Sequence, residues 1–155
     1  MAMPERLPST PTGAGEPSRG GGTGIPAAVL ALLGGLFHLV GVAGGAVLMA
    51  GDGDLGRALL TFLLHLVVAG LLITGGVGLV LAKPFGRRAT IAGCVAAILL
   101  YLAVVVLGGS GVFFLGLTDG TLPLGYTVIL CVPAVTTLVL ACAPPTRRWV
   151  RSGWS

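Results

Sequence analysis

The chain has 155 residues, of which 55% are hydrophobic and only 9% are charged. Soluble domains carry about a quarter charged residues, so this composition excludes an ordinary soluble domain. The net charge is +4. The basic residues are few and most of them lie beside apolar blocks, where they determine membrane orientation, so nucleic-acid binding is not expected.

Residues 1–25 are rich in Pro, Gly, Ser and Thr and nearly lack large apolar side chains. Such a segment cannot bury enough apolar surface to offset the entropy cost of ordering it, so it is predicted to be a disordered tail. It does not fit a signal peptide, because the apolar stretch that follows starts too late, runs too long and is followed by three more.

Four long apolar blocks follow the tail, and none of them contains Asp, Glu, Lys or Arg. They cover residues 27–50, 58–82, 89–108 and 122–143. Each is long enough to cross about 30 Å of hydrocarbon at about 1.5 Å per residue. Without water to satisfy the backbone, such blocks must be helical. The predicted fold is an all-α membrane protein, an antiparallel bundle of four transmembrane helices within residues 26–143.

The connections between the blocks predict the orientation. The second connection, residues 83–88, is predicted to be a tight basic turn in which Pro84 ends the second helix. Eight of the nine Lys and Arg residues lie in the N-terminal tail, in this turn or in the C-terminal segment 144–155, whereas the other two loops contain only Arg57. The positive-inside rule therefore predicts that both termini are cytoplasmic and that residues 144–155 form a basic cytoplasmic tail.

Two histidines lie inside the predicted spans. His38 is about 18 Å and His65 about 12 Å from the loop that joins the first two spans, at about 1.5 Å per residue. Because these spans are antiparallel neighbours, the imidazoles can meet or share a ligand if both face inward. Ionisable residues within a membrane are functional-site candidates. His38 and His65 are therefore candidate cofactor-binding residues, with haem as the candidate cofactor and proton relay or metal binding as alternatives.

The other interpretation of the histidines is structural. Each neutral imidazole would hydrogen-bond a hydroxyl or carbonyl group and help to hold the helices together. Thr61, one turn before His65, and Tyr101, midway along the third span, are candidate partners. Haem and metal sites usually bring further ligands or carboxylates that orient the ligands, and the spans contain no carboxylate. No metal site is therefore predicted.

Small residues recur at helical spacing on three of the spans, so that they share one face of each helix. The candidate packing glycines are, in chain order, Gly34, Gly41, Gly45, Gly70, Gly78 and Gly93. Faces of small residues let membrane helices approach one another closely. They predict packing within the bundle, or contact with a second copy or a larger membrane complex.

Sequence motifs of known reactions are absent. Cys94, Cys131 and Cys142 lie in apolar segments without CxxC spacing, which gives neither a disulfide framework nor a zinc site. The chain has no GxSxG, HExxH or phosphate-binding loop. No catalytic residue is predicted, and the protein is not expected to be an enzyme.

Pro133 lies in the middle of the fourth block. It predicts a kink that frees the carbonyl near Ile129, because proline has no N–H to donate to it. Thr136 and Thr137 are candidate groups to compensate for the lost hydrogen bond.

Three stretches of the chain carry a resemblance to a known group of proteins: ALLGGLFHL at residues 31–39, the basic turn at 83–88, and PPTRRW at 144–149. Over residues 26–150 the chain resembles the small four-span membrane proteins of actinobacteria that carry Pro/Gly-rich N-terminal tails. That family is itself uncharacterised. The resemblance implies a location in a bacterial plasma membrane and no particular catalytic residue.

Three functions follow as hypotheses. The first is a structural or accessory membrane subunit that packs against itself or a larger complex through its glycine faces. The second is a redox subunit in which His38 and His65 bind haem or a metal. The third is a small transporter in which the histidines are the only groups in the spans that titrate near neutral pH.

Overall fold

A computed structural model of the chain describes residues 22–51, 54–108 and 124–152. These residues form five helices, namely α1 (Gly24–Ala50), α2 (Leu55–Val80), α3 (Pro84–Gly108), α4 (Leu124–Cys142) and α5 (Pro144–Ser152). Within the described ranges there is no strand. The predicted N-terminal tail up to residue 21 and the predicted loop at 109–121 lie outside the described residues.

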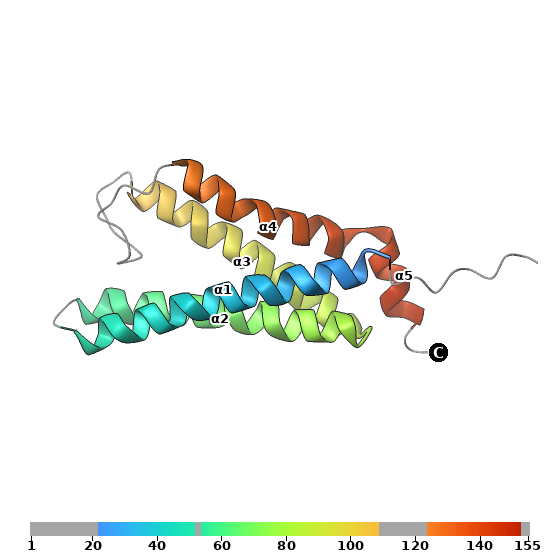
Figure 1. The fold of residues 1–155 in the computed structure, drawn as a ribbon, viewed down its shortest axis with the longest axis horizontal. Coiled ribbons are helices and arrows are strands. Elements are labelled where there is room, and N and C mark those ends of the chain that lie inside the picture. The colour runs from blue at the N-terminus through green and yellow to red at the C-terminus, as the bar shows by residue number, and fades with distance from the viewer. Residues whose placement is uncertain (1–21, 52–53, 109–123, 153–155) are drawn as a thin grey trace, which may run out of the picture.

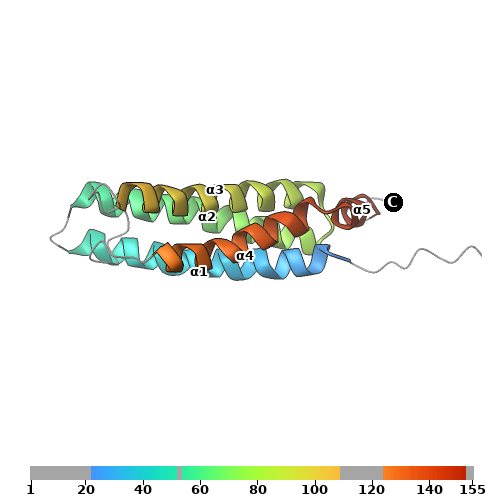
Figure 2. The same cartoon turned by 90° about the horizontal axis from the view of Figure 1, so that it is seen from above.

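The four long helices form a bundle in which each helix packs against its neighbours in the chain, and α4 closes the ring against α1. Figure 2 shows α2 and α3 on one side of the bundle and α1 and α4 on the other. In Figure 1, α3 and α4 diverge from α1 and α2 towards the end of the bundle that lies away from α5. The short helix α5 lies across the opposite end (Figure 1).

The helix α2 begins three residues earlier than the predicted second span. Asp54 is its N-cap, and the side chain of Asp54 accepts hydrogen bonds from the backbone N–H groups of Gly56 and Arg57 at 3.0 and 3.3 Å. The same carboxylate pairs with the Arg57 guanidinium at 3.1 Å. A side-chain acceptor at this position satisfies two N–H groups that have no partner within the helix, which explains why the helix begins at Leu55.

The prediction that Pro84 ends the second helix is wrong. The helix α2 ends at Val80, and Pro84 is the first residue of α3. The chain leaves α2 through a Schellman motif, in which the Lys83 N–H donates to the Gly78 carbonyl at 2.8 Å and Ala82 has a φ of 52°. Pro84 then fits the first helical position, where no N–H is needed and φ is already helical.

Small residues fill the interior, whereas large apolar side chains point outward. The fully buried apolar positions are mostly alanines, such as Ala27, Ala28 and Ala31, each 0% exposed. By contrast Val40, Val47 and many other Val, Leu and Ile side chains of the four long helices are exposed. Membrane helices pack in this way, because lipid solvates large apolar side chains as well as a protein core does.

Length and composition agree with this burial pattern. The helices α1, α2 and α3 are each long and apolar enough to cross a membrane, and α4 with α5, which meet at a bend of 57°, would make a fourth candidate span. Three to four apolar helices with outward-facing Leu and Val side chains indicate a multi-pass membrane protein.

Candidate functional site: a buried histidine pair beside a cavity

The two histidines meet where α1 crosses α2. The Nδ1 atoms of His38 and His65 lie 2.9 Å apart, and the two residues are 2% and 5% exposed. Gly41, one turn after His38, makes room for this contact: a Cβ at Gly41 would overlap the His65 imidazole. The glycine face on α1 thus positions the ring of His65 as well as allowing close helix packing.

Because α2 starts early, the two histidines lie at similar distances from the ends of their helices. His38 lies 12 residues before the end of α1 at Ala50, and His65 lies 10 residues after the start of α2 at Leu55. At about 1.5 Å per residue, these positions are about 18 and about 15 Å from their helix ends. The predicted difference in depth was larger because the second span was expected to begin at residue 58.

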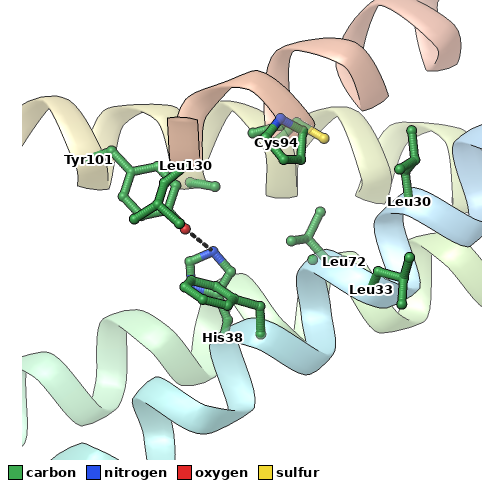
Figure 3. Close-up of a pocket in the computed structure, with 12 residues that line it drawn as sticks. Leu30, Leu33, His38, Leu72, Cys94, Tyr101 and Leu130 are labelled. Carbon is green, nitrogen blue, oxygen red and sulfur yellow. Dashed lines mark hydrogen bonds between the residues drawn. The ribbon is translucent and has the colours of Figure 1, made fainter. Parts of the chain in front are cut away.

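Tyr101 on α3 extends the pair into a chain of three side chains. Its hydroxyl lies 3.3 Å from Nε2 of His38, on the side of the ring that faces away from His65. The rings of Tyr101 and His38 are also stacked, with centroids 5.8 Å apart and planes at 27°. Tyr101 is 6% exposed, so the chain joins α1, α2 and α3 inside the bundle. Figure 3 shows the Tyr101 hydroxyl pointing at the His38 ring.

The contact between two Nδ1 atoms requires one hydrogen between them, and this allows two tautomeric arrangements. If His38 donates, its Nε2 is bare and accepts from the Tyr101 hydroxyl, and His65 carries its hydrogen on Nε2. If His65 donates, His38 carries its second hydrogen on Nε2 and donates to the oxygen of Tyr101. The Tyr101 hydroxyl hydrogen is then available to another acceptor.

Nε2 of His65 has no hydrogen-bond partner in either arrangement. This atom is buried and unpaired. A buried polar atom without a partner costs about 1–3 kcal/mol, and such atoms in native proteins call for an explanation. The row of three hydrogen-bonded side chains therefore ends on α2 at Nε2 of His65. This atom is a donor in one tautomer and an acceptor in the other.

A cavity of about 290 Å³ adjoins Tyr101 and His38, at the end of the three hydrogen-bonded side chains that lies away from His65 (Figure 3). It is lined by side chains of all four long helices: Leu30, Leu33, Gly34, Phe37, His38, Leu72, Cys94, Ala97, Tyr101, Leu130, Pro133 and Ala134. Figure 3 shows Leu130 near Tyr101 at one end and Leu30 near Leu33 at the other. Apart from the Cys94 thiol, the polar side-chain groups in this lining belong to His38 and Tyr101.

Some of the residues that line the cavity on α1 and α4 are exposed at the surface of the bundle, among them Pro133 on α4. Two of its lining residues on α1, Leu33 and Phe37, are 57% and 48% exposed. Deeper lining residues such as Cys94 and Ala97 are each 1% exposed. The lining thus combines exposed apolar residues with buried residues beside His38 and Tyr101, and none of the lining residues is Asp, Glu, Lys or Arg.

The candidate packing glycines occupy different surroundings. A Cβ on five of them would come within 3.4 Å of a neighbouring helix: Gly34 and Gly93 against Leu72, Gly41 against His65, Gly45 against Phe62, and Gly78 against Gly86. Gly70 differs, because it is exposed and a Cβ there would meet nothing within 4 Å. The close contacts therefore lie inside the bundle, and Gly70 takes no part in them.

Sequence reasoning missed several residues of this region. Gly35 and Gly76 make close contacts between α1 and α2, and the sequence prediction did not include either of them, although Ala31 lies four positions before Gly35. Cys94 and Ala134 line the cavity, although they look like ordinary small residues of a span. Pro133 was noted only for its effect on the backbone, and it too lines the cavity.

The two threonines after Pro133 do not compensate for the carbonyl of Ile129. Thr136 donates to the Val132 carbonyl at 2.8 Å, and Thr137 donates to the Pro133 carbonyl at 2.7 Å. Each hydroxyl bonds to the carbonyl four residues earlier, which is the usual local pattern for threonine in a helix. The predicted compensation is therefore wrong, because both side chains already have acceptors within their own turn.

The arrangement of the histidines does not fit haem. Two nitrogens that hold an iron from opposite faces of a haem lie about 4 Å apart, at about 2 Å per metal–nitrogen bond, with the porphyrin between them. The 2.9 Å contact between His38 and His65 leaves no such gap. Among the residues that the structure describes, no group of three or more His, Cys, Asp or Glu side chains is placed to hold a metal ion.

Comparison with known proteins adds no family or relative to this site. No family model matches the chain, and no curated protein or solved structure is significantly similar to it.

Proposed function

We propose that this protein binds a small, mainly apolar molecule with one hydrogen-bonding group, which enters from the bilayer between α1 and α4. The observation that carries this proposal is the cavity of about 290 Å³, with apolar walls and two polar groups, His38 and Tyr101, that converge at one place. Ligand sites typically combine apolar walls with a few placed polar groups and often lie between the helices of a bundle. An engineered apolar cavity of about 150 Å³ already binds benzene.

The same proposal includes insertion and orientation. The helix α4 has 19 residues and reaches about 28 Å, close to the about 30 Å of a hydrocarbon core, so α1 to α4 would each span the bilayer. The positive-inside rule favours a cytoplasmic position for both termini and for the turn between α2 and α3. A bacterial plasma membrane is the location that the resemblance of the sequence favours.

The two tautomers of the histidine pair indicate which ligand groups fit. When His38 donates to His65, the Tyr101 oxygen uses its hydrogen on His38 and can accept one from a ligand. When His65 donates to His38, the Tyr101 hydroxyl can donate to a ligand carbonyl or ether. A single shift of hydrogens along the chain would therefore let the cavity hold either an alcohol or a carbonyl compound.

The other predicted roles have less support from the geometry. A structural role through the glycine faces stays a prediction, since the glycines that make close contacts do so within the bundle. Homo-oligomerisation or membership of a larger complex likewise stays a prediction. A haem role does not fit the direct contact of the histidines. Transport stays a prediction, and no observation favours it.

Photoaffinity labelling of the full chain in nanodiscs tests the proposed function. The probes are a medium-chain alcohol that carries a diazirine and the diazirine hydrocarbon of the same length. We expect the alcohol to label the peptides around Phe37 and Leu130 about two- to tenfold more than the hydrocarbon does, as one hydrogen bond of about 0.5–1.5 kcal/mol predicts.

A matched pair of variants controls for nonspecific labelling by probe dissolved in the bilayer. Ala134→Phe fills the cavity and is expected to suppress labelling of these peptides by the alcohol, whereas Val135→Phe adds the same ring at a position that is 45% exposed on the outer surface. Equal labelling in both variants, or no preference for the alcohol over the hydrocarbon, would refute the proposal. Gel filtration of both variants checks that they remain folded.

A further inference from the structure

The helix α5 packs against the bundle with one side and exposes a row of arginines on the other. Thr146 and Val150, one turn apart, are 0% and 4% exposed. Arg147, Arg148 and Arg151 lie on the opposite side of the helix and are exposed. The sequence predicts a basic tail here, and the structure adds that the tail is a helix with an inner and an outer face.

Hydrogen bonds to two other helices hold α5 in place. The Trp149 indole N–H donates to the Leu79 carbonyl near the end of α2 at 3.2 Å. The Thr146 hydroxyl donates to the Leu140 carbonyl at 2.6 Å and accepts from the Thr23 hydroxyl, which precedes α1, also at 2.6 Å. The helix α5 is thus joined to the ends of α1, α2 and α4, and a ligand on its outer face would stabilise this whole end of the bundle.

Among the residues that the structure describes, the positive charge at this end has no acidic partner. Lys83 and Arg88 are exposed where α2 passes into α3, at the same end as α5 (Figure 1). The basic face therefore consists of Lys83, Arg88, Arg147, Arg148 and Arg151. Asp54 is the one acidic residue within residues 22–51, 54–108 and 124–152; it lies at the far end of α2 and pairs there with Arg57.

We propose that the basic face is a binding surface for anionic phospholipid headgroups, with α5 lying in the plane of the membrane interface. Short helices with an apolar face and a Lys/Arg face lie in this plane, and their arginines bind phosphate well. The bend of 57° between α4 and α5 turns the chain out of the direction of the span. Headgroups are the phosphates that surround this end of the bundle at highest concentration, provided that the spans insert as proposed above.

Reconstitution of the full chain tests this inference. Proteoliposomes are made from phosphatidylcholine alone or from equal parts of phosphatidylcholine and phosphatidylglycerol, and the lipids that remain bound after gentle detergent extraction are counted by native mass spectrometry. We expect phosphatidylglycerol to be enriched by at least about tenfold over phosphatidylcholine among the retained lipids. We also expect its presence to raise the melting temperature of the protein.

Three variants distinguish a loss of lipid binding caused by lost charge from one caused by misfolding. The triple replacement Arg147→Gln, Arg148→Gln and Arg151→Gln is expected to abolish the enrichment, while the same three positions changed to Lys are expected to keep most of it. Arg57→Gln, which removes an arginine from the opposite end, is expected to change nothing. The triple Gln variant keeps Lys83, Arg87 and Arg88, so the orientation signal of the second turn is retained.

The experiment gives a different result for each way in which the inference could be wrong. Inorganic phosphate added at the same charge concentration is expected to give no stabilisation, because it is not held at the interface; stabilisation by phosphate alone would overturn the proposed lipid. Equal retention of both lipids by the wild type would overturn the inference while leaving insertion intact. If the protein did not float with either kind of vesicle, the proposed insertion of the spans would be refuted, and the headgroup preference would fall with it.

Discussion

Replacing Gly41 with isoleucine is expected to break the packing of α1 on α2. Even a Cβ at Gly41 would overlap the His65 imidazole, and isoleucine adds three more carbons at the same place. Overpacking costs about 1–3 kcal/mol and occasionally more, and here a buried ring and its hydrogen bond are displaced together, so a loss of at least about 3 kcal/mol is expected. Reversible unfolding in mixed micelles measures it.

Gly70→Ile provides the matched control. Gly70 lies on α2 in an open position, with nothing within 4 Å of an added Cβ. The same substitution there is expected to change the unfolding free energy by no more than about 0.5 kcal/mol. Similar stability of the two variants would contradict the close contact between Gly41 and His65. A loss of self-association in Gly70→Ile without loss of stability would instead favour the predicted interface with a second copy.

The substitution His38→Leu is expected to destabilise the protein more than His65→Leu does. His38 occupies the middle of the row of three side chains, so its removal leaves Nδ1 of His65 and the Tyr101 hydroxyl without the partners they have now, while Nε2 of His65 stays unpaired. Removal of His65 leaves only Nδ1 of His38 unpaired and also removes the buried unpaired Nε2. At about 1–3 kcal/mol per unpaired buried group, we expect about 3 kcal/mol for His38→Leu and about 1 kcal/mol for His65→Leu.

The double variant separates the hydrogen bond from the loss of packing. Pair couplings between membrane helices average about 0.6 kcal/mol and reach about 1.7 kcal/mol, so His38→Leu with His65→Leu should cost less than the two single changes together. Thr74→Val serves as control, since Thr74 is exposed and bonds only to carbonyls of its own helix. Equal losses for both single variants, or strict additivity, would argue against a chain with His38 at its centre.

Much of this architecture follows from the sequence because the signals that determine it are local. Uncharged apolar blocks predict helices wherever lipid or a dry interior denies water to the backbone. Helix ends depend on finer chemistry. Asp54 extends α2 towards the N-terminus, and Pro84 starts α3 instead of ending α2. Both outcomes follow from how side chains satisfy or remove backbone donors, which hydrophobicity does not record.

The candidate site could be predicted only in part. Antiparallel neighbours predict that His38 and His65 can approach each other, but which atoms meet depends on helix rotation, which a spacing pattern leaves open. Tyr101 was a candidate partner for the histidines, and the structure pairs its hydroxyl with His38. The cavity depends on how far α3 and α4 stand from α1 and α2, and residues such as Ala134 carry no sign of this in the sequence. The segment that forms α5 was predicted only as a tail, because nine residues are too few to show a clear helical spacing of apolar and basic side chains.

Nuclear magnetic resonance of the full chain labelled with ¹⁵N-histidine tests the central claim most directly. The chain has only two histidines, so the spectrum contains four ring nitrogens. We expect a scalar coupling across the hydrogen bond between the Nδ1 atoms of His38 and His65, carried by a single hydrogen that is protected from exchange with water. Two uncoupled imidazoles, each with hydrogens that exchange freely with solvent, would contradict the buried pair and the chain of side chains built on it.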